Sequence, residues 1–85
     1  MKKYIITKCS SIKLIITDVD GVLTDGGMYY SEKGESFKKF NTRDGMGVEL
    51  LRNHKIPVVI ITGENSKIVL KRAKKLLIKD VFIGI

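Results

Sequence analysis

Three short apolar segments rich in β-branched residues constrain the fold most strongly. They are residues 13–17 (KLIIT), 57–62 (PVVIIT) and 80–85 (DVFIGI). Runs of this length that end near glycine or acidic residues are typical of buried β-strands. The third run reaches Ile85 without a turn or a polar cap, so we expect a fold that is truncated after its third core strand.

A β-hairpin is predicted between the first two strands, at about residues 27–40. Alternating residues there flank the sequence Ser31-Glu32-Lys33-Gly34, which is typical of a turn between antiparallel strands.

Two helices are also predicted. The first runs from about Asp44 to His54. Its inward residues are expected to be Val48, Leu51 and either Met46 or Leu50. The second is capped by Ser66 and runs through Leu77. Its apolar face is expected to contain Ile68, Val69, Ala73, Leu76 and Leu77, with lysines on the opposite face.

The order of these elements predicts an α/β fold. Strand, hairpin, helix, strand, helix, strand implies parallel strands joined by right-handed helical crossovers, as in a Rossmann-like three-layer sheet. No repeat or linker divides the sequence, so residues 1–85 are expected to form a single partial domain. In such sheets, ligands bind at the carboxyl ends of the strands.

Length and charge limit the function classes. A domain of 85 residues buries a modest share of its surface, so a partner or further sequence is expected to stabilise it. No apolar run approaches the roughly 20 residues that span a bilayer, and no signal peptide is complete, which predicts a cytoplasmic protein without a membrane partner. The lone Cys9 agrees with a reducing compartment. The net charge of +7 fits nucleic acid, a membrane surface or a small anionic substrate, and the distribution of charge has to decide between them.

Three aspartates, Asp18, Asp20 and Asp25, follow the first strand. Alternate side chains of an extended segment share a face, so Asp18 and Asp20 can face one ligand while Val19 returns to the core. Two close carboxylates repel each other unless a cation compensates, and Mg²⁺ is the usual cation beside phosphate. The alternative is that the aspartates only cap turns, which suits Asp25 before Gly26 best.

The string DVDGVLTDG resembles the first motif of the haloacid dehalogenase superfamily, DxDGxxT, which Asp18, Asp20, Gly21 and Thr24 match in place. The resemblance implies that Asp18 attacks phosphorus to form an aspartyl-phosphate, while Asp20 protonates the leaving oxygen and then activates water. It also implies Mg²⁺ bound by the Asp18 carboxylate, the Asp20 backbone carbonyl and a later acidic motif.

The second motif of that superfamily is a Ser or Thr at the end of the next core strand, and Thr62-Gly63 matches it in position. The resemblance implies that the Thr62 hydroxyl and neighbouring amides hold the phosphoryl oxygens. The alternative is an ordinary turn at the end of a strand. The superfamily's charge-neutralising lysine and its acidic metal motif are expected beyond Ile85. Losing even one such contact costs roughly 10²–10³ in rate, so a chain without both would be nearly inert.

A narrower resemblance covers nearly the whole chain. GGMYYSEKGESFKKF followed by FNTRDGMGVELL looks like the capless branch that dephosphorylates 3-deoxy-octulosonate (KDO) 8-phosphate or the 9-phosphates of sialic-acid-type sugars such as KDN. This branch implies a homotetramer, in which the hairpin is a flap over a neighbour's active site.

The same resemblance assigns a substrate loop to Asn41, Thr42, Arg43, Asp44 and Gly45. Within it, Arg43 suits a sugar carboxylate and Asp44 suits the N-cap of the helix. Octulosonate phosphatases tend to carry an arginine where this chain has Glu64. Glu64 together with Lys75 resembles the nine-carbon branch and favours a KDN or sialic acid 9-phosphate. Arg72 matches a basic position of both groups, or is simply a solvated arginine.

Other functions lack their sequence apparatus. There is no GxxxxGK[ST] loop, no GxGxxG and no Cys/His ligand spacing. A response-regulator-like acceptor would carry its aspartate on a later strand. A nucleic-acid-binding module would use the lysines of residues 67–79, but such basic helices are usually solvated faces, so no nucleic acid partner is expected. The main alternative to an enzyme is an inactive fragment or relative with a structural role.

Overall fold

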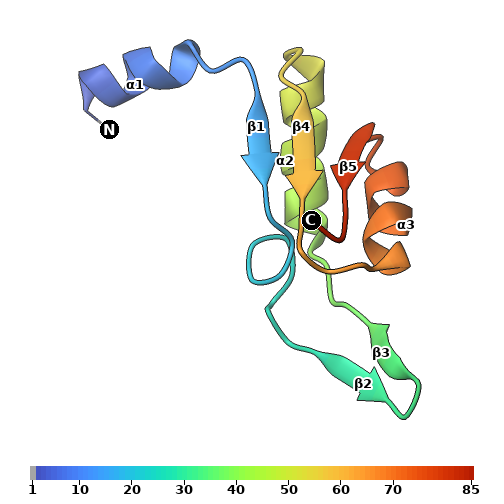
Figure 1. The fold of residues 1–85 in the computed structure, drawn as a ribbon. Coiled ribbons are helices and arrows are strands. Elements are labelled where there is room, and N and C mark those ends of the chain that lie inside the picture. Colours follow the sequence, from blue (N-terminus) through green and yellow to red (C-terminus); the bar gives the residue numbers. More distant parts are fainter. Residues whose placement is uncertain (1) are drawn as a thin grey trace.

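A three-stranded parallel sheet forms the centre of the protein in this computed structural model. The structure describes residues 2–85, so Met1 of the predicted domain lies outside the described residues. Strands β1 (Ile15–Thr17), β4 (Val58–Ile61) and β5 (Asp80–Phe82) lie in the order β1-β4-β5 (Figure 1). Ile16 pairs with Val59, and Val59 pairs with Asp80. The α/β class and the parallel sheet are confirmed.

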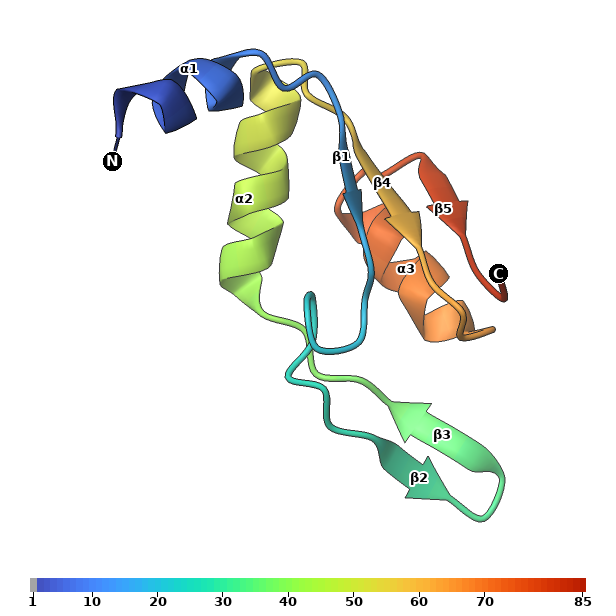
Figure 2. The ribbon, with the colours of Figure 1, turned by 60° about the vertical axis from the view of Figure 1, so that its left-hand side comes forward.

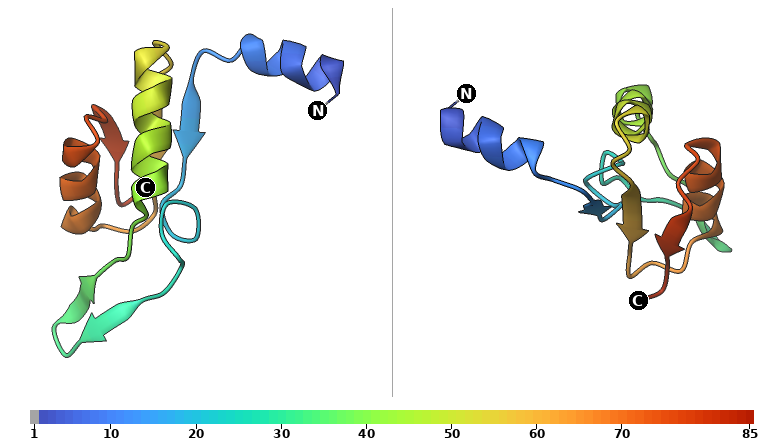
Figure 3. Two further views of the ribbon diagram at one scale, coloured as in Figure 1. Left: turned by 180° about the vertical axis from the view of Figure 1, so that it is seen from behind. Right: turned by 90° about the horizontal axis from the view of Figure 1, so that it is seen from above.

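Helices α2 (Thr42–Asn53) and α3 (Lys67–Lys75) cover one face of this sheet, as Figure 3 shows from above. Side chains alternate along β4, so Val58 and Ile60 are buried against the helices while Ile61 on the other face is 38% exposed. The core consists of Val19, Val48, Val58, Ile60, Val69, Ala73 and Ile78. The described residues therefore build two layers, the sheet and one layer of helices.

The faces of both helices differ in part from the prediction. In α2, Val48 is buried and Leu51 is half-buried, but Met46 and Leu50 are 58% and 53% exposed, so neither is a further inward residue. In α3, Val69 and Ala73 are buried, and Ile68 and Leu76 are half-buried. The inclusion of Leu77 is wrong: α3 ends at Lys75, and Leu77 follows in a left-handed turn with φ 59° and is 63% exposed.

The predicted hairpin is confirmed. Strands β2 (Tyr29–Ser31) and β3 (Gly34–Phe37) are antiparallel, and Ser31 pairs with Gly34 across the turn. The rings of Tyr29 and Phe37 stack with their centroids 4.3 Å apart. Figure 2 shows the hairpin projecting from the end of the sheet at which the strands finish.

A short helix that the sequence analysis did not predict, α1 (Lys3–Ser10), precedes β1 and extends away from the sheet (Figure 1). It has no buried residues. Across residues 2–85, no helix combines the length and apolar character needed to span a membrane.

Candidate active site

The loop after β1 presents the two predicted catalytic aspartates at the carboxyl edge of the sheet. Asp18 is exposed, and its Oδ1 accepts a hydrogen bond from the Val19 amide at 2.7 Å. Val19 is 1% exposed and belongs to the core, as predicted. The Val19 carbonyl accepts hydrogen bonds from the amides of Val22, Leu23 and Thr24. Burial of Val19 thus fixes the point at which the chain turns back, and Asp18 stays on the outside.

Thr24 closes this loop. Its Oγ1 accepts hydrogen bonds of 3.1 Å from the amides of Gly21 and Gly26, whose positive φ values of 77° and 79° favour glycine. Thr24 also forms an isolated antiparallel bridge with Phe40, just before α2. Asp25 accepts a hydrogen bond from the Gly27 amide at 2.9 Å, which is the turn-forming role considered for it.

A buried lysine from the base of the hairpin reaches the same loop. Lys38 Nζ lies 2.8 Å from Asp20 Oδ1 and 2.9 Å from Glu35 Oε1, and its side chain is 1% exposed. Burial by itself lowers the pKa of the Lys38 ammonium, but the hydrogen bonds and charges of Asp20 and Glu35 outweigh burial and raise that pKa. Lys38 is therefore a cation that holds the Asp20 carboxylate in place.

Lys38 and Glu35 are not among the residues predicted from the sequence. Strand alternation in FKKF indicates that Lys38 and Lys39 point to opposite sides. Nothing in the sequence says which of the two sides faces Asp20, because that depends on how the hairpin folds back onto the loop.

Thr62 and Gly63 follow β4 at the edge where Asp18 follows β1, because the two strands are parallel neighbours. Thr62 is 3% exposed. Its Oγ1 accepts a hydrogen bond from the Glu64 amide at 3.3 Å, while the Glu64 side chain is exposed. The structure thus brings the two predicted motifs together on adjacent strands.

The predicted substrate loop forms the N-cap and first turn of α2, at the end of the helix nearest the hairpin (Figure 1). Asn41 Oδ1 accepts a hydrogen bond from the Arg43 amide at 2.8 Å, so Asn41 is the N-cap and the prediction of Asp44 as cap is wrong. Asp44 lies in the first turn, where its negative charge interacts favourably with the helix dipole. Thr42 and Arg43 are exposed.

Arg72 ties α3 to the start of α2. Its guanidinium donates a hydrogen bond of 3.0 Å to the Asn41 carbonyl and lies 5.4 Å from the centroid of the Phe40 ring. A Cβ at Gly45 would lie 3.2 Å from this guanidinium and 3.1 Å from Leu76, so glycine permits the close approach of the helices. Arg72 is therefore more than a solvated arginine.

Lys75 lies apart from the residues above. It is exposed in the last turn of α3, whereas Glu64 precedes the first turn. The nine-residue helix between them is about 13 Å long. The structure does not bring Glu64 and Lys75 together.

The resemblance assigns Mg²⁺ to the Asp18 carboxylate and the Asp20 backbone carbonyl, and both are hard oxygen ligands of the kind that magnesium prefers. Asp20 offers its carboxylate to Lys38 instead. Over residues 2–85, no cluster of three or more His, Cys, Asp or Glu residues could hold a metal ion. The described residues therefore fit one side of a magnesium site that needs further ligands.

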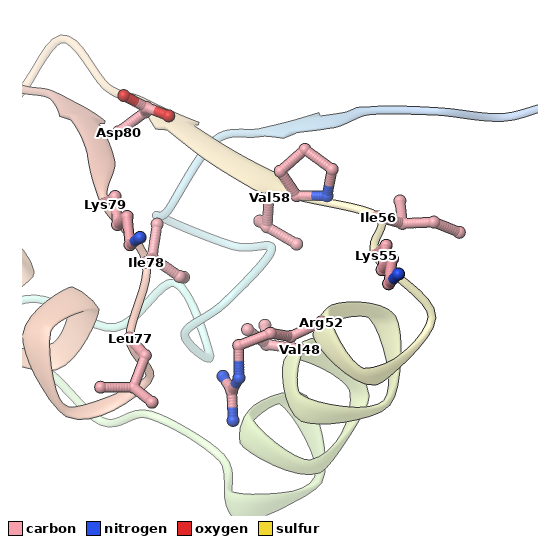
Figure 4. A pocket seen from close by; sticks show the side chains of 10 residues that line it. Val48, Arg52, Lys55, Ile56, Val58, Leu77, Ile78, Lys79 and Asp80 are labelled. Carbon is pink, nitrogen blue, oxygen red and sulfur yellow. The ribbon is translucent and has the colours of Figure 1, made fainter.

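A cavity of about 280 Å³ lies at the opposite edge of the sheet, where β4 and β5 begin (Figure 4). Its lining is formed by Val48, Arg52, Lys55, Ile56, Pro57, Val58, Leu77, Ile78, Lys79 and Asp80. None of the predicted catalytic, phosphate-binding or substrate-binding residues lines it, so it is separate from the candidate active site.

Curated relatives cover nearly the whole chain. A scan of protein-family models finds no match. The chain is 46% identical over 77 residues to the 3-deoxy-D-manno-octulosonate 8-phosphate phosphatase KdsC of Haemophilus influenzae, covering 91% of this chain and 43% of that protein. It is 44% identical over 80 residues to KdsC of Escherichia coli K12, covering 94% of this chain and 43% of the relative.

Solved structures agree with these relatives. A putative KDO 8-phosphate phosphatase from Vibrio cholerae matches 100% of this chain and 48% of its own, with 44% identity and a TM-score of 0.94. The Moraxella catarrhalis phosphatase, solved with magnesium, phosphate and KDO, matches 100% of this chain and 49% of its own, with 40% identity and a TM-score of 0.90. A putative HAD superfamily hydrolase from Legionella pneumophila matches 92% and 43%, with 40% identity and a TM-score of 0.86.

The chain spans a little under half the length of these relatives. Within that span, the sequence agreement and the superposition extend over the aspartate loop, the hairpin and the sheet. By sequence and by fold, the chain belongs to the KdsC-like branch of the haloacid dehalogenase superfamily.

Proposed function

We propose that this chain forms the nucleophile-bearing part of a magnesium-dependent phosphatase that hydrolyses KDO 8-phosphate. The observation that carries the proposal is that Asp18 and Thr62 leave neighbouring parallel strands at one edge, with Asp20 two residues after Asp18. The substrate class comes from the names of the relatives and from the KDO-containing neighbour structure.

Asp18 is the proposed nucleophile. Its Oδ1 accepts a hydrogen bond from the Val19 amide, which leaves Oδ2 as the attacking atom. Oδ2 forms a bond with phosphorus while the bond from phosphorus to the sugar oxygen breaks. Asp20 enters this step with a proton on Oδ2, while its Oδ1 accepts the hydrogen bond from Lys38, and it gives that proton to the departing oxygen. Water then attacks the aspartyl-phosphate, Asp20 takes the proton of that water, and phosphate leaves with Asp18 restored.

Thr62 and Gly63 are proposed to contact the phosphoryl oxygens through the Thr62 hydroxyl and the nearby amides. Bound magnesium, held in part by the Asp18 carboxylate and the Asp20 carbonyl, supplies positive charge beside the phosphoryl group. The Moraxella catarrhalis neighbour solved with magnesium supports a divalent metal for this branch.

The first turn of α2 is proposed to bind the sugar acid. Arg43 is exposed there, and its planar guanidinium suits bidentate pairing with a carboxylate. Arg72 holds this turn in place by donating a hydrogen bond to the Asn41 carbonyl. The preference for a nine-carbon 9-phosphate rested on Glu64 with Lys75, whereas the relatives are named for KDO 8-phosphate, which favours the eight-carbon sugar.

Apolar side chains on the hairpin support the homotetramer that the resemblance implies. Met28, Tyr30 and Phe37 are 53%, 66% and 55% exposed on this projecting element. Contact with a neighbouring copy would bury them. Analytical sedimentation of the chain would test this. A monomer at micromolar concentration would contradict the proposal that the hairpin is a flap over a neighbour's active site.

The decisive experiment measures phosphate released by the 85-residue chain from KDO 8-phosphate and from a 9-phosphorylated nonulosonate, with and without Mg²⁺. Asp18→Asn is expected to abolish release. Asp25→Asn is the matched control, because Asp25 lies in the same loop and bonds only the Gly27 amide there. Equal release by Asp18→Asn would disprove the proposed nucleophile.

Two other outcomes are informative. No release from either sugar would favour a structural role, with activity belonging to a longer protein. The relatives' greater length leaves room for the lysine and acidic motif that the resemblance implies. Binding to nucleic acid that falls steeply with salt and persists in Asp18→Asn would instead favour a nucleic-acid-binding module.

A further inference from the structure

The hairpin depends on contacts at its base for its orientation. Strands β2 and β3 pair with each other and project from the sheet (Figure 2). At the base, Thr24 bridges to Phe40, and Lys38 follows β3 directly. Because a two-stranded hairpin is only marginally stable by itself, these contacts decide how it is held.

Lys38 joins a carboxylate of the hairpin to a carboxylate of the aspartate loop. Its Nζ donates to Asp20 Oδ1 at 2.8 Å and to Glu35 Oε2 at 3.1 Å. The Lys38 side chain is 1% exposed, and those of Asp20 and Glu35 are 27% and 18% exposed. A buried ammonium has no water to replace a lost carboxylate, so all three groups depend on one another.

We infer that Lys38 is a positioning residue that couples the placement of the hairpin to the orientation of the Asp20 carboxylate. Movement of the hairpin carries Lys38 and Glu35 with it, and the Asp20 carboxylate follows its hydrogen-bond donor. Conversely, removal of the Asp20 charge loosens the hairpin. The consequence for proton transfer rests on the proposed function of Asp20, but the coupling does not.

The coupling can be measured without any enzymatic activity, by amide hydrogen exchange in the 85-residue chain. Asp20→Asn is expected to speed exchange of the hydrogen-bonded hairpin amides by about 10- to 100-fold, since a hydrogen bond between charged groups is lost. Asp25→Asn, in the same loop but bonded to Gly27, is expected to leave them unchanged. Equal exchange in the Asp20 and Asp25 variants, or hairpin amides already unprotected in the unaltered chain, overturns the inference.

A double-mutant cycle tests whether Lys38 carries the effect. Lys38→Met is expected to speed hairpin exchange as much as Asp20→Asn does, and the double variant is expected to be no faster than Lys38→Met alone. Additive effects would mean that Asp20 and Lys38 act independently, which contradicts the inference.

A spectroscopic measurement separates coupling from simple support of the hairpin. Glu35 touches Lys38, so Glu35→Gln is expected to shift the carbon-13 signal of the Asp20 carboxyl group. Glu32→Gln in the hairpin turn is the matched control and is expected to leave that signal in place. If the Asp20 carboxyl signal does not move in Glu35→Gln, the coupling is refuted, even if Asp18→Asn abolishes phosphate release. If the signal moves but the chain releases no phosphate, the coupling stands and only the proposed function is refuted.

Discussion

The sheet and the hairpin are stabilised by different interactions. In the sheet and its two helices, seven apolar residues are buried together, with Ile60, Val69 and Ala73 each 1% exposed. In the hairpin, Tyr30 and Phe37 are more than half exposed, and the contacts beyond strand pairing include one aromatic stack, the Thr24–Phe40 bridge and the Lys38 ion pairs.

Because of this difference, we expect the sheet and the hairpin to respond to different kinds of substitution. Apolar burial depends on shape and volume and changes little with charge. The base of the hairpin depends on one ammonium and two carboxylates, so it responds to charge and pH. Core substitutions should therefore weaken the sheet, and charge substitutions the hairpin.

The largest effect is expected from Ile60→Ala in β4. Ile60 is 1% exposed, so truncation leaves a cavity and lowers the free energy of unfolding by about 3 kcal/mol. That is a large share of the stability of a small domain. Denaturant unfolding followed by circular dichroism measures it.

Ile61→Ala is the matched control, since the same side chain is 38% exposed on the uncovered face. A smaller loss is expected there. Equal losses in the two variants would show that the sheet is not stabilised by burial against α2 and α3.

The next largest effect is expected from Lys38→Met, at about 2 kcal/mol of unfolding free energy near neutral pH. The folded pKa of Lys38 is raised above the ordinary 10.5. Its contribution is therefore complete below pH 10.5 and is lost as pH rises through the folded pKa. Unfolding of both chains at rising pH should show their difference shrinking at strongly alkaline pH, and a difference that stays constant with pH contradicts the ion pair.

The sequence predicted the sheet and hairpin because their patterns are local. β-Branched runs mark β1, β4 and β5, and a four-residue turn marks the hairpin. Boundaries were less accurate: α2 begins at Thr42 rather than Asp44, because Asn41 competes successfully as the cap. Helix α1 was not predicted because its apolar residues, Tyr4, Ile5 and Ile6, are consecutive rather than spaced at helical intervals, and all three are exposed.

The sequence predicted only those residues of the candidate site that lie at or just after the end of a strand. Asp18 and Thr62 follow strands directly, with Asp20 two residues after Asp18, and parallel pairing brings the two strand ends together. Lys38 and Arg72 act across the fold, on Asp20 and on the Asn41 carbonyl. Sequence spacing says nothing about such contacts, because they depend on how separate elements pack. The separation of Glu64 from Lys75 follows from the direction of α3, which leads away from the carboxyl edge.

A smaller effect is expected where the chain passes from the hairpin into α2. Asn41→Ala removes the side-chain cap and should lower the free energy of unfolding by about 1 kcal/mol. Ser66→Ala is the matched control, because Ser66 occupies the N-cap of α3 without a side-chain capping hydrogen bond. Denaturant unfolding compares the two. A greater loss in Ser66→Ala would mean that capping does not set the start of α2.

The smallest effect is expected from Phe37→Leu, which removes the stack on Tyr29 but keeps an apolar side chain. An aromatic pair contributes about 0.5–1.5 kcal/mol, so hairpin amides should exchange a few times faster while the amides of β4 stay unchanged. Tyr30→Leu is the control, because Tyr30 lies opposite Glu35 and is 66% exposed. If Phe37→Leu also speeds exchange in β4, the hairpin and the sheet open together, and the division between a charge-dependent hairpin and an apolar sheet fails.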